Sequence, residues 1–326
     1  GLVMRERFDY HLLTHCPNIE VRDRCPLRSY EEDSKQVIVT LQNGEKCAGR
    51  YLIAADGATS IIARRVIAAQ GKKRAFIPAI EVEAYLPDQW LEKYAAGPRF
   101  IFEGPRYGYG WIFPKADHLT IGAASLRPHG DSLQRQLYRI LKSCGLSPDR
   151  FRIEGHPIPL YNSRLPLAAS RILLTGDAAG LVDPFSGEGI RPALKSGRIA
   201  AQTILNDSIS AYPARIRKEV AQTYPYSRWI GYFFYSLREL CLLFGAPNPY
   251  TTQAILDDIS DQGSSIGILL QALATLPYYL IIEAAALIIG VARGQQQQAR
   301  FLNTVYPGKS LPRTDLPRHP ADEAGC

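Results

Sequence analysis

The spacing of hydrophobic positions changes along the chain and predicts helices separated by runs of strands. Residues 3–13 carry Phe8, Leu12 and Leu13 at helical spacing, which predicts an amphipathic helix with these side chains on one face. Further helices with apolar residues at the same spacing are expected at residues 59–69, 132–143 and 189–205. After Tyr212 the chain becomes mostly helical with long aromatic faces, and from residue 311 proline and charge predict a frayed tail.

Shorter apolar runs bounded by glycine and proline predict strands. Asn43-Gly44 lies between two such runs and is a hairpin signal. Between residues 79 and 126 the runs are rich in aromatic and β-branched residues, the pattern of a meandering antiparallel sheet. The expected strands are residues 19–22, 37–41, 50–55, 81–86, 99–103, 109–113, 118–123 and 172–174.

The order of these elements predicts an α/β domain interrupted by a β-rich insertion, because alternating strands and helices flank a block of consecutive strands. The α/β domain is expected in two segments, residues 1–70 and 166–212, with the insertion at 71–165. Residues 213–326 are expected to form a C-terminal helical region that ends in the frayed tail.

The composition predicts a folded core and an anionic partner. A chain of 326 residues with 46% hydrophobic residues can bury a substantial core. The net charge of +7 favours phosphates or a membrane surface as partners. Nucleic acid is not expected, because no helix-turn-helix, zinc finger or RNA-binding aromatic motif accompanies the spread basic residues.

The six cysteines are scattered without a C-x-x-C pair, so neither a zinc site nor an iron–sulfur cluster is predicted, and we expect ordinary reduced thiols. No basic and apolar leader with a small-residue cleavage site opens the chain, which argues against secretion. Because the chain begins at Gly1 instead of Met, we also expect natural sequence to be missing before it.

The segment from Leu174 to Ala201 has the sequence of a ligand-binding turn. A buried strand leads to Gly176 and Asp177, and Gly187 and Gly189 then open a helix with a small-residue face. Glycines permit a tight turn and a close backbone approach, while a carboxylate accepts hydrogen bonds from hydroxyl groups. The N–H groups at the helix start attract an electron-rich oxygen or a phosphate. A helix-capping aspartate in a plain strand–helix connection is the alternative interpretation.

This segment resembles the second FAD fingerprint of the para-hydroxybenzoate-hydroxylase-like flavoproteins, G-D-A-A followed by D-P and G-x-G. The resemblance implies that Asp177, with Gly176 at the same turn, binds the ribityl chain of FAD. It also implies that four residues flank the isoalloxazine ring: Pro184, Gly187, Gly189 and Ile190. The implied fold is a Rossmann-like FAD-binding domain, with the β-rich insertion as the substrate-binding domain.

Two further motifs fit the same family. Asp56-Gly57 resembles its D-G motif, in which the carboxylate supports the pyrophosphate region, although Asp-Gly is also a common turn. Arg5, with Phe8 and Asp9, resembles an R-x-x-F-D-x-x-L helix whose arginine reaches the flavin, and a solvated surface arginine is the alternative. The N-terminal G-x-G-x-x-G is absent, so the FAD-binding domain is expected to be incomplete at its N-terminus.

The middle sheet resembles that of the geranylgeranyl reductase family of FAD-dependent oxidoreductases. The resemblance rests on a Y-x-W-x-F-P motif, in which Tyr109, Trp111 and Phe113 alternate along a strand and share one face. The resemblance implies that these three aromatic residues line the substrate cavity, whereas an ordinary sheet core is the alternative interpretation. His156 precedes a proline and is expected to be structural.

The resemblance implies an FAD-dependent enzyme that saturates carbon–carbon double bonds of a geranylgeranyl or other polyprenyl chain by hydride transfer from the reduced flavin. NAD(P)H or another reductant would supply the electrons, and Tyr109 is the candidate proton donor. Two alternatives stay open, a flavin monooxygenase acting on an aromatic or isoprenoid substrate and an inactive prenyl-lipid-binding remnant.

The expected partner is a prenyl-chain small molecule or lipid, and the expected location is the cytoplasm or the periphery of a membrane. Residues 266–292 are strongly apolar, but Gln271, Pro277 and Glu283 would be costly at the centre of a bilayer. We therefore expect a core helix pair or a surface helix there, not a transmembrane helix.

Overall fold

A computed structural model of the chain describes residues 2–102, 107–126, 133–237 and 281. Nearly all of them belong to one compact unit, Gly1–Ser236, and a second unit comprises Leu237–Cys326. The apolar segment at residues 266–292 and the expected tail lie outside the described residues, apart from Ile281. Among the described helices, none is both long and apolar enough to cross a membrane.

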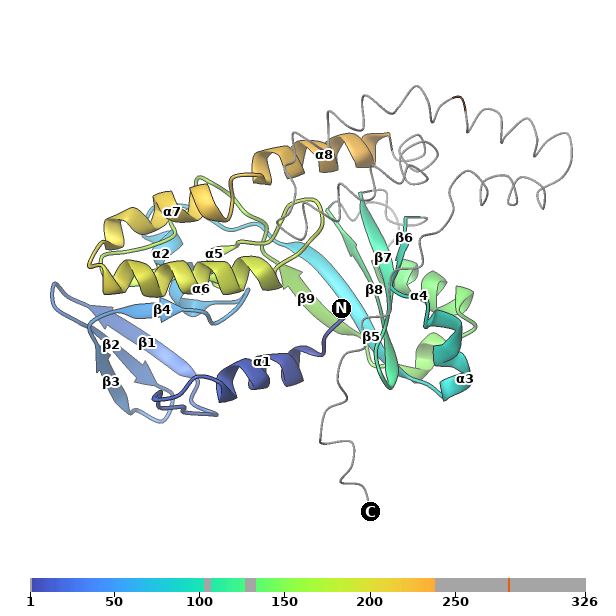
Figure 1. The fold of residues 1–326 in the computed structure, drawn as a ribbon, viewed down its shortest axis with the longest axis horizontal. Coiled ribbons are helices and arrows are strands. Elements are labelled where there is room, and N and C mark those ends of the chain that lie inside the picture. Colours follow the sequence, from blue (N-terminus) through green and yellow to red (C-terminus); the bar gives the residue numbers. More distant parts are fainter. Residues whose placement is uncertain (1, 103–106, 127–132, 238–280, 282–326) are drawn as a thin grey trace, which may run out of the picture. The chain divides into compact units, whose positions relative to one another are not determined.

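The described residues form eight α-helices, ten strands and three short 3₁₀ helices (Figure 1). The α-helices are α1 (Arg5–Thr14), α2 (Ile61–Ala68), α3 (Asp88–Leu91), α4 (Leu133–Ser143), α5 (Gly176–Ala179), α6 (Ile190–Leu205), α7 (Tyr212–Glu219) and α8 (Tyr224–Ser236). The strands are β1 (Leu27–Glu32), β2 (Val37–Leu41), β3 (Lys46–Gly49), β4 (Leu52–Ala54), β5 (Ile77–Tyr85), β6 (Arg99–Ile101), β7 (Gly108–Pro114), β8 (His118–Ser125), β9 (Glu154–Ile158) and β10 (Ile172–Leu174). The 3₁₀ helices are η1 (Glu92–Tyr94), η2 (Pro148–Arg150) and η3 (Ile209–Ala211).

The α/β core is built on β4 and β10, which pair in parallel with Ala54 opposite Leu174. β10 is apolar and fully buried along its length, as expected of a strand covered on both faces. Helices α2, α6 and α7 contribute to the same hydrophobic cluster as these strands, and Figure 1 shows α6 and α7 side by side. This arrangement confirms the predicted α/β class.

The helices after residue 212 pack on this core. The Tyr212 hydroxyl donates a hydrogen bond to the Leu174 carbonyl at 2.6 Å, and Ile216 and Tyr224 are buried in the same cluster. The first compact unit accordingly extends through α8 to Ser236. The domain limits predicted from the sequence stay a prediction. In the structure, however, α7 and α8 pack on the α/β core, although both were expected to lie mainly in a separate C-terminal region.

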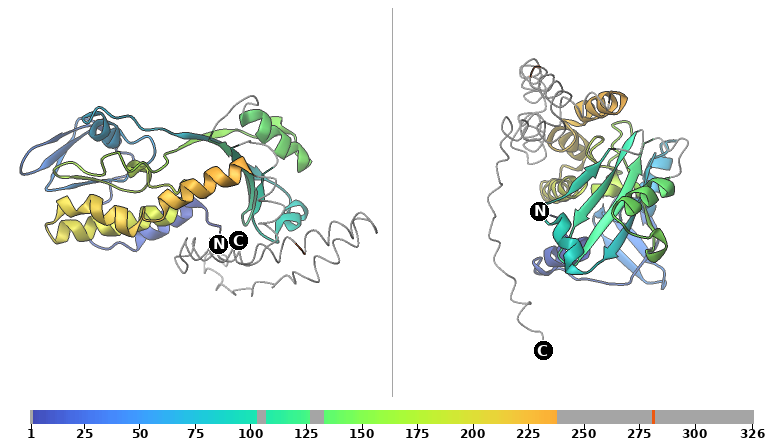
Figure 2. Two further views of the ribbon diagram at one scale, coloured as in Figure 1. Left: turned by 90° about the horizontal axis from the view of Figure 1, so that it is seen from above. Right: turned by 90° about the vertical axis from the view of Figure 1, so that its right-hand side faces the viewer.

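The second sheet is antiparallel, with strand order β6-β7-β8-β5-β9. One face packs against α4 through an apolar cluster that includes Ile112, Ile121 and Leu137. The opposite face carries Tyr109, Trp111 and Phe113, packed with Ala79 and Ala124. Figure 2 shows α4 against this sheet from two further directions. The predicted antiparallel sheet is confirmed, and its two faces differ in chemistry.

Several local predictions were wrong. No strand forms at residues 19–22, where Ile19 and Val21 are exposed, and β1 forms further along the chain. The 50–55 run contains β4, but β4 joins the parallel pair, and the hairpin partner of β2 is β3, which ends at Gly49 before that run. No residue of α1 is buried, so its expected apolar face packs against no described core.

β9 and α5 were not predicted at all. β9 contains Gly155 and Pro157, which argue against a strand in sequence, but proline is tolerated here because β9 is the edge of its sheet. α5 is a single turn of four residues, too short to produce a periodic pattern.

Candidate functional site

The site begins where the parallel strands end. Because β4 and β10 are in parallel register, the turns that follow them emerge at the same edge of the sheet. Asp56 lies on the turn after β4, and Asp177 lies in α5, directly after β10. The Thr175 N–H donates to the Ala54 carbonyl at 3.0 Å and holds the two turns together. The predicted motifs therefore meet in space.

Gly176 allows α6 to approach the turn closely. Its φ of 51° lies in the left-handed region that favours glycine, and a Cβ there would lie 2.9 Å from the Cβ of Ala193. Its N–H donates to the Ser196 hydroxyl at 2.9 Å. The small face predicted for this helix is thus the surface on which the turn rests.

The Asp177 carboxylate is half-buried and has no hydrogen-bond donor among the described residues. Burial raises the pKa of this carboxyl, while the nearby Arg5 and Arg74 guanidinium groups oppose the rise. A Cβ on Gly189, the residue before α6, would lie 3.3 Å from Asp177 Oδ1. An unsatisfied acceptor therefore faces the N-terminal end of a helix, where hydroxyl groups of a ligand could donate to it.

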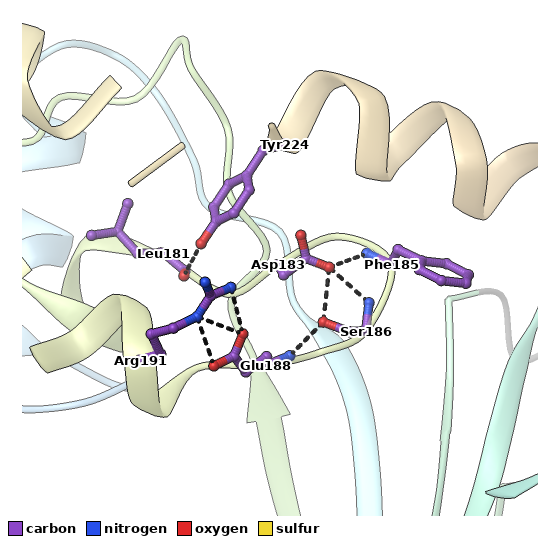
Figure 3. Close-up of polar contacts among 7 residues, drawn as sticks. All are labelled: Leu181, Asp183, Phe185, Ser186, Glu188, Arg191 and Tyr224. Atoms are coloured by element: carbon purple, nitrogen blue, oxygen red, sulfur yellow. Dashed lines mark hydrogen bonds and ion pairs between the residues drawn. The ribbon is translucent and has the colours of Figure 1, made fainter. Parts of the chain in front are cut away.

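The loop from Asp183 to Glu188 is held by its own hydrogen bonds (Figure 3). Asp183 Oδ1 accepts from the Phe185 N–H at 3.0 Å, the Ser186 N–H at 2.8 Å and the Ser186 hydroxyl at 2.9 Å. The Ser186 hydroxyl in turn accepts from the Glu188 N–H at 3.2 Å. The D-P-x-S-G sequence thus folds as an aspartate-centred turn that presents Gly187 and Gly189 before α6.

Two contacts brace this loop from outside. Arg191 in α6 forms an ion pair with Glu188 at 3.1 Å, and the Tyr224 hydroxyl donates to the Leu181 carbonyl at 3.0 Å (Figure 3). Tyr224 belongs to α8, so this helix helps to fix the segment that leads into the loop. Gly187 itself is exposed and has a φ of 73°.

The aromatic face of the second sheet meets this loop at Tyr109. The Tyr109 hydroxyl donates to the Ser186 carbonyl at 2.8 Å, and burial together with the Asp183 carboxylate raises its pKa to about 12. Trp111 follows along the strand with ring centroids 5.9 Å apart, and Phe113 stacks on Trp111 at 6.1 Å. The three side chains share one face as predicted and lead away from the loop.

A small cavity lies where the sheet and the loop meet. It encloses ≈ 30 Å³ and is lined mainly by apolar and aromatic residues, among them Tyr109, Pro184, Phe185, Gly187, Ile158 and Tyr235. Tyr109, Pro184 and Gly187 are all residues predicted from the sequence. The structure thus brings a predicted substrate residue against predicted ring-flanking residues.

Asp56 takes part in a helix cap. Its carboxylate accepts from the Ile61 N–H at 3.2 Å, and the Ser60 hydroxyl accepts from the Ala63 N–H at 2.9 Å. Gly57 has a φ of 78°, as a tight turn requires. Asp56 is exposed, so one carboxylate oxygen caps α2 and the other is accessible to a ligand.

Arg74 was not predicted, and it links the two turns. Its guanidinium donates to the carbonyls of Ala58 at 3.4 Å, Asp177 at 3.2 Å and Ala178. Burial lowers the pKa of Arg74, and the Asp177 and Asp56 carboxylates oppose the shift. No local pattern marks this arginine, because its partners are far away in sequence. Asp183 and Ser196 were also missed as organising residues, although the turn sequence after Asp183 is a recognisable signal.

Arg5 lies near Asp177 but is engaged locally. Its guanidinium pairs with Asp9 at 2.8 Å on the exposed surface of α1, and this hydrogen bond is the main reason its pKa is raised. The Asp177 carboxylate acts on it electrostatically from further away. Arg5 is thus an exposed arginine bonded within its own helix, and its role toward the flavin stays a prediction.

A larger groove of ≈ 590 Å³ lies elsewhere, at residues that precede β4 and β10, including Tyr51 and Arg171. It is open to solvent, and the Arg171 guanidinium is already bonded to the carbonyls of Ser34 and Arg50. Ligands of open parallel sheets bind beyond the carboxyl ends of the strands, which is the opposite end. The turns after these strands are therefore the better candidate site despite the smaller cavity.

The chain is similar to known reductases over about half of its length. No protein-family model matches the chain. The chloroplastic geranylgeranyl diphosphate reductase of Arabidopsis thaliana is 35% identical over 162 residues, covering 48% of this chain and 34% of that protein. The menaquinone reductase of Mycobacterium tuberculosis is 32% identical over 190 residues, covering 54% of this chain and 46% of that protein.

A solved structure shares the fold. The geranylgeranyl bacteriochlorophyll reductase-like protein of Thermoplasma acidophilum superposes with a TM-score of 0.61 at 22% identity, over 85% of this chain and 73% of that one. This chain thus spans less than half the length of the two reductases it matches by sequence.

Proposed function

We propose that this chain, which is similar to geranylgeranyl reductases over about half of its length, is an FAD-dependent oxidoreductase of that family, holds the flavin end of FAD and saturates carbon–carbon double bonds of a polyprenyl chain. The observation that carries the proposal is the hydrogen bond between the Tyr109 hydroxyl and the Ser186 carbonyl. It joins an apolar aromatic face to a glycine loop that opens a helix. A ligand ring at that loop would lie beside a long, flat apolar surface.

The residues present fit a flavin. Asp177 has free acceptor capacity for the hydroxyl groups of a ribityl chain, and Gly176 anchors that turn to α6. Gly187, Gly189 and the first turn of α6 at Ile190 would offer N–H groups to the oxygen-rich edge of the ring, with Pro184 beside it. Asp56, Gly57 and Arg5 would act toward the pyrophosphate and the ring. Reduced FAD, when bound, would supply a hydride to one olefinic carbon while a proton reaches the other.

The chain's own contribution is position and exclusion of water. Tyr109, Trp111 and Phe113 present a continuous apolar face that favours a prenyl chain, and their mutual edge and stacking contacts keep that face in place. Tyr109 is the candidate proton donor, but with a pKa of about 12 it releases a proton reluctantly at neutral pH. Its hydroxyl would also have to leave the Ser186 carbonyl.

The reductant, the partner and the location belong to the same proposal. NAD(P)H or another reductant would return electrons to the flavin, and a prenyl-chain small molecule or lipid would be the substrate. Access to such a substrate favours a location in the cytoplasm or at the periphery of a membrane. The net charge of +7 favours contact with anionic lipid headgroups.

The deciding experiment is the absorption spectrum of the protein purified together with any natural sequence that precedes Gly1. A bound flavin that is bleached by reductant and reoxidised anaerobically by a polyprenyl substrate is the expected result. Oxygen-dependent consumption of NAD(P)H with a hydroxylated product would favour a monooxygenase instead. A colourless protein that still binds prenyl lipid would favour an inactive remnant.

Substrate and cofactor roles can be separated in the same preparation. Trp111→Ala should weaken turnover of a prenyl substrate while the flavin stays bound. Loss of the flavin in this variant would contradict the assignment of Trp111 to the substrate face.

A further inference from the structure

The orientation of Trp111 depends on the two strands next to its own. Trp111 in β7 is paired with Gly122 in β8, and Gly122 is paired with Glu81 in β5. Paired residues of an antiparallel sheet project from the same face, so the three positions form a row across the sheet. The indole, the empty glycine position and the carboxylate therefore lie next to one another.

Gly122 leaves the space that the indole occupies. A Cβ there would lie 2.2 Å from Cζ2 and 2.4 Å from Cε2 of Trp111. The backbone of Gly122 does not have a positive φ, so the requirement for glycine comes from space and not from backbone conformation. The indole thus lies across β8 with its nitrogen-bearing edge over the glycine.

The Glu81 carboxylate lies on the far side of this row, at the position in β5 that is paired with Gly122. Burial raises the pKa of this carboxyl, while the neighbouring His156 and the Trp111 indole oppose the rise. Glu81 is also paired with Nε2 of His156 at 3.3 Å, which holds the carboxylate from the neighbouring edge strand β9. Trp111 is 8% exposed, so its N–H has little access to water and requires an acceptor within the protein.

We propose that Glu81 is a positioning residue that fixes the plane of the Trp111 indole across Gly122 and thereby sets the selectivity of the aromatic face for long prenyl chains. The part of this inference that concerns the substrate rests on the proposed function. Tyr109 adjoins the loop, and Trp111 is the next ring along the strand. A short chain would contact mainly Tyr109, whereas a long chain would need the fixed indole and Phe113 behind it.

The physical part is tested by fluorescence of the full chain with Trp111 as its only tryptophan, made by Trp90→Phe and Trp229→Phe. Glu81→Met keeps the length of the side chain and removes the acceptor, whereas Glu81→Gln keeps an acceptor oxygen. Glu81→Met should shift the Trp111 emission to longer wavelength and raise acrylamide quenching about twofold, because a released indole meets more water. Glu81→Gln should stay near the parent.

Glu83→Gln is the matched control. Glu83 lies on the same face of the same strand, but its carboxylate is bonded to Thr120 at 2.7 Å and paired with His118 at 3.0 Å. It should leave the Trp111 emission unchanged. Identical Trp111 emission and quenching in Glu81→Met and Glu83→Gln would overturn the proposal. If Glu81→Met does not fold, Glu81→Ala must produce the same spectral change.

The selectivity part is measured on the flavin-loaded enzyme with a geranylgeranyl and a geranyl substrate. Glu81→Met should raise KM for the longer substrate about fivefold and that for the shorter one less than about twofold, with kcat for both nearly unchanged. Equal effects on the two substrates would overturn the link from Glu81 to chain length. Failure of the parent enzyme to reduce either substrate would instead contradict the proposed function and leave the fluorescence result standing.

Discussion

Two carboxylates on the same connection between β10 and α6 have opposite environments. Asp183 accepts three hydrogen bonds from its own loop, whereas Asp177 accepts none from the described residues although it is half-buried. A buried acceptor without a donor costs stability, and a satisfied one contributes to it. Asp183 therefore helps to build the site, whereas the geometry of Asp177 is suited to a ligand.

The same contrast divides the arginines and tyrosines around them. The Arg74 guanidinium donates through Nη1 and Nη2, and Tyr224 through its hydroxyl, to backbone carbonyls that hold the turns in place. Among the described residues, Arg5 is hydrogen-bonded only within α1, and the Asp177 carboxylate acts on it electrostatically. Groups that bind the backbone define the shape of the site, and acceptors without a donor define what it can bind.

The largest expected effect is on flavin affinity. Asp177→Ala should weaken FAD binding by at least about 100-fold, because two hydrogen bonds to a charged acceptor contribute roughly 3 kcal/mol or more. The measurement is a titration of FAD followed by its fluorescence, with Asp207→Ala, at a carboxylate bonded to Tyr51 away from the turns, as the control. Unchanged affinity would show that Asp177 is not the ribityl ligand.

Asp183→Ala should act on stability more than on chemistry. Loss of three hydrogen bonds is expected to lower the free energy of unfolding by about 2 to 3 kcal/mol, and urea denaturation measures it. Asp183→Asn keeps the Oδ1 acceptor and should recover most of the loss. If both variants were as stable as the parent, the loop would not depend on this aspartate.

Asp177→Asn should have the opposite effect on stability and raise the free energy of unfolding of the flavin-free chain by about 1 kcal/mol. Burial raises the pKa of Asp177, so the folded chain binds its proton more readily than the unfolded chain does. This carboxyl therefore lowers stability as the pH rises through its raised pKa. The advantage of Asp177→Asn should be greatest above that pKa and disappear at lower pH, and denaturation across the acidic range would reveal the opposite trend if the assignment is wrong.

The smallest effect is expected for Tyr109→Phe. Removing the hydrogen bond to the Ser186 carbonyl should lower stability by about 1 kcal/mol and change flavin affinity little. Turnover distinguishes the two roles of this residue. If Tyr109 is only an anchor, Tyr109→Phe should keep most of the activity, measured by anaerobic reoxidation of the flavin. If Tyr109 is the proton donor, the variant should lose nearly all of it.

Sequence reasoning was strongest where local pattern and local chemistry coincide. The buried strand β10, the helix α6 and the antiparallel sheet were all predicted, because their hydrophobic periods are long or their runs continuous. It was weakest at the ends of the sheets. The 19–22 run has strand composition but no partner strand, and β9 is a strand only because β5 provides one.

By itself, the sequence indicated a resemblance to flavoproteins and the residues that could bind, since a carboxylate, glycines and aromatic side chains keep their chemistry wherever they are placed. The tertiary structure alone decided which of them is free. Asp177 and Asp183 are both aspartates on a glycine-rich connection, and only their surroundings give Asp183 three donors and leave Asp177 with none among the described residues. Arg74 acquired its role in the same way, through partners far along the chain, because hydrogen bonding depends on distance in space and not in sequence.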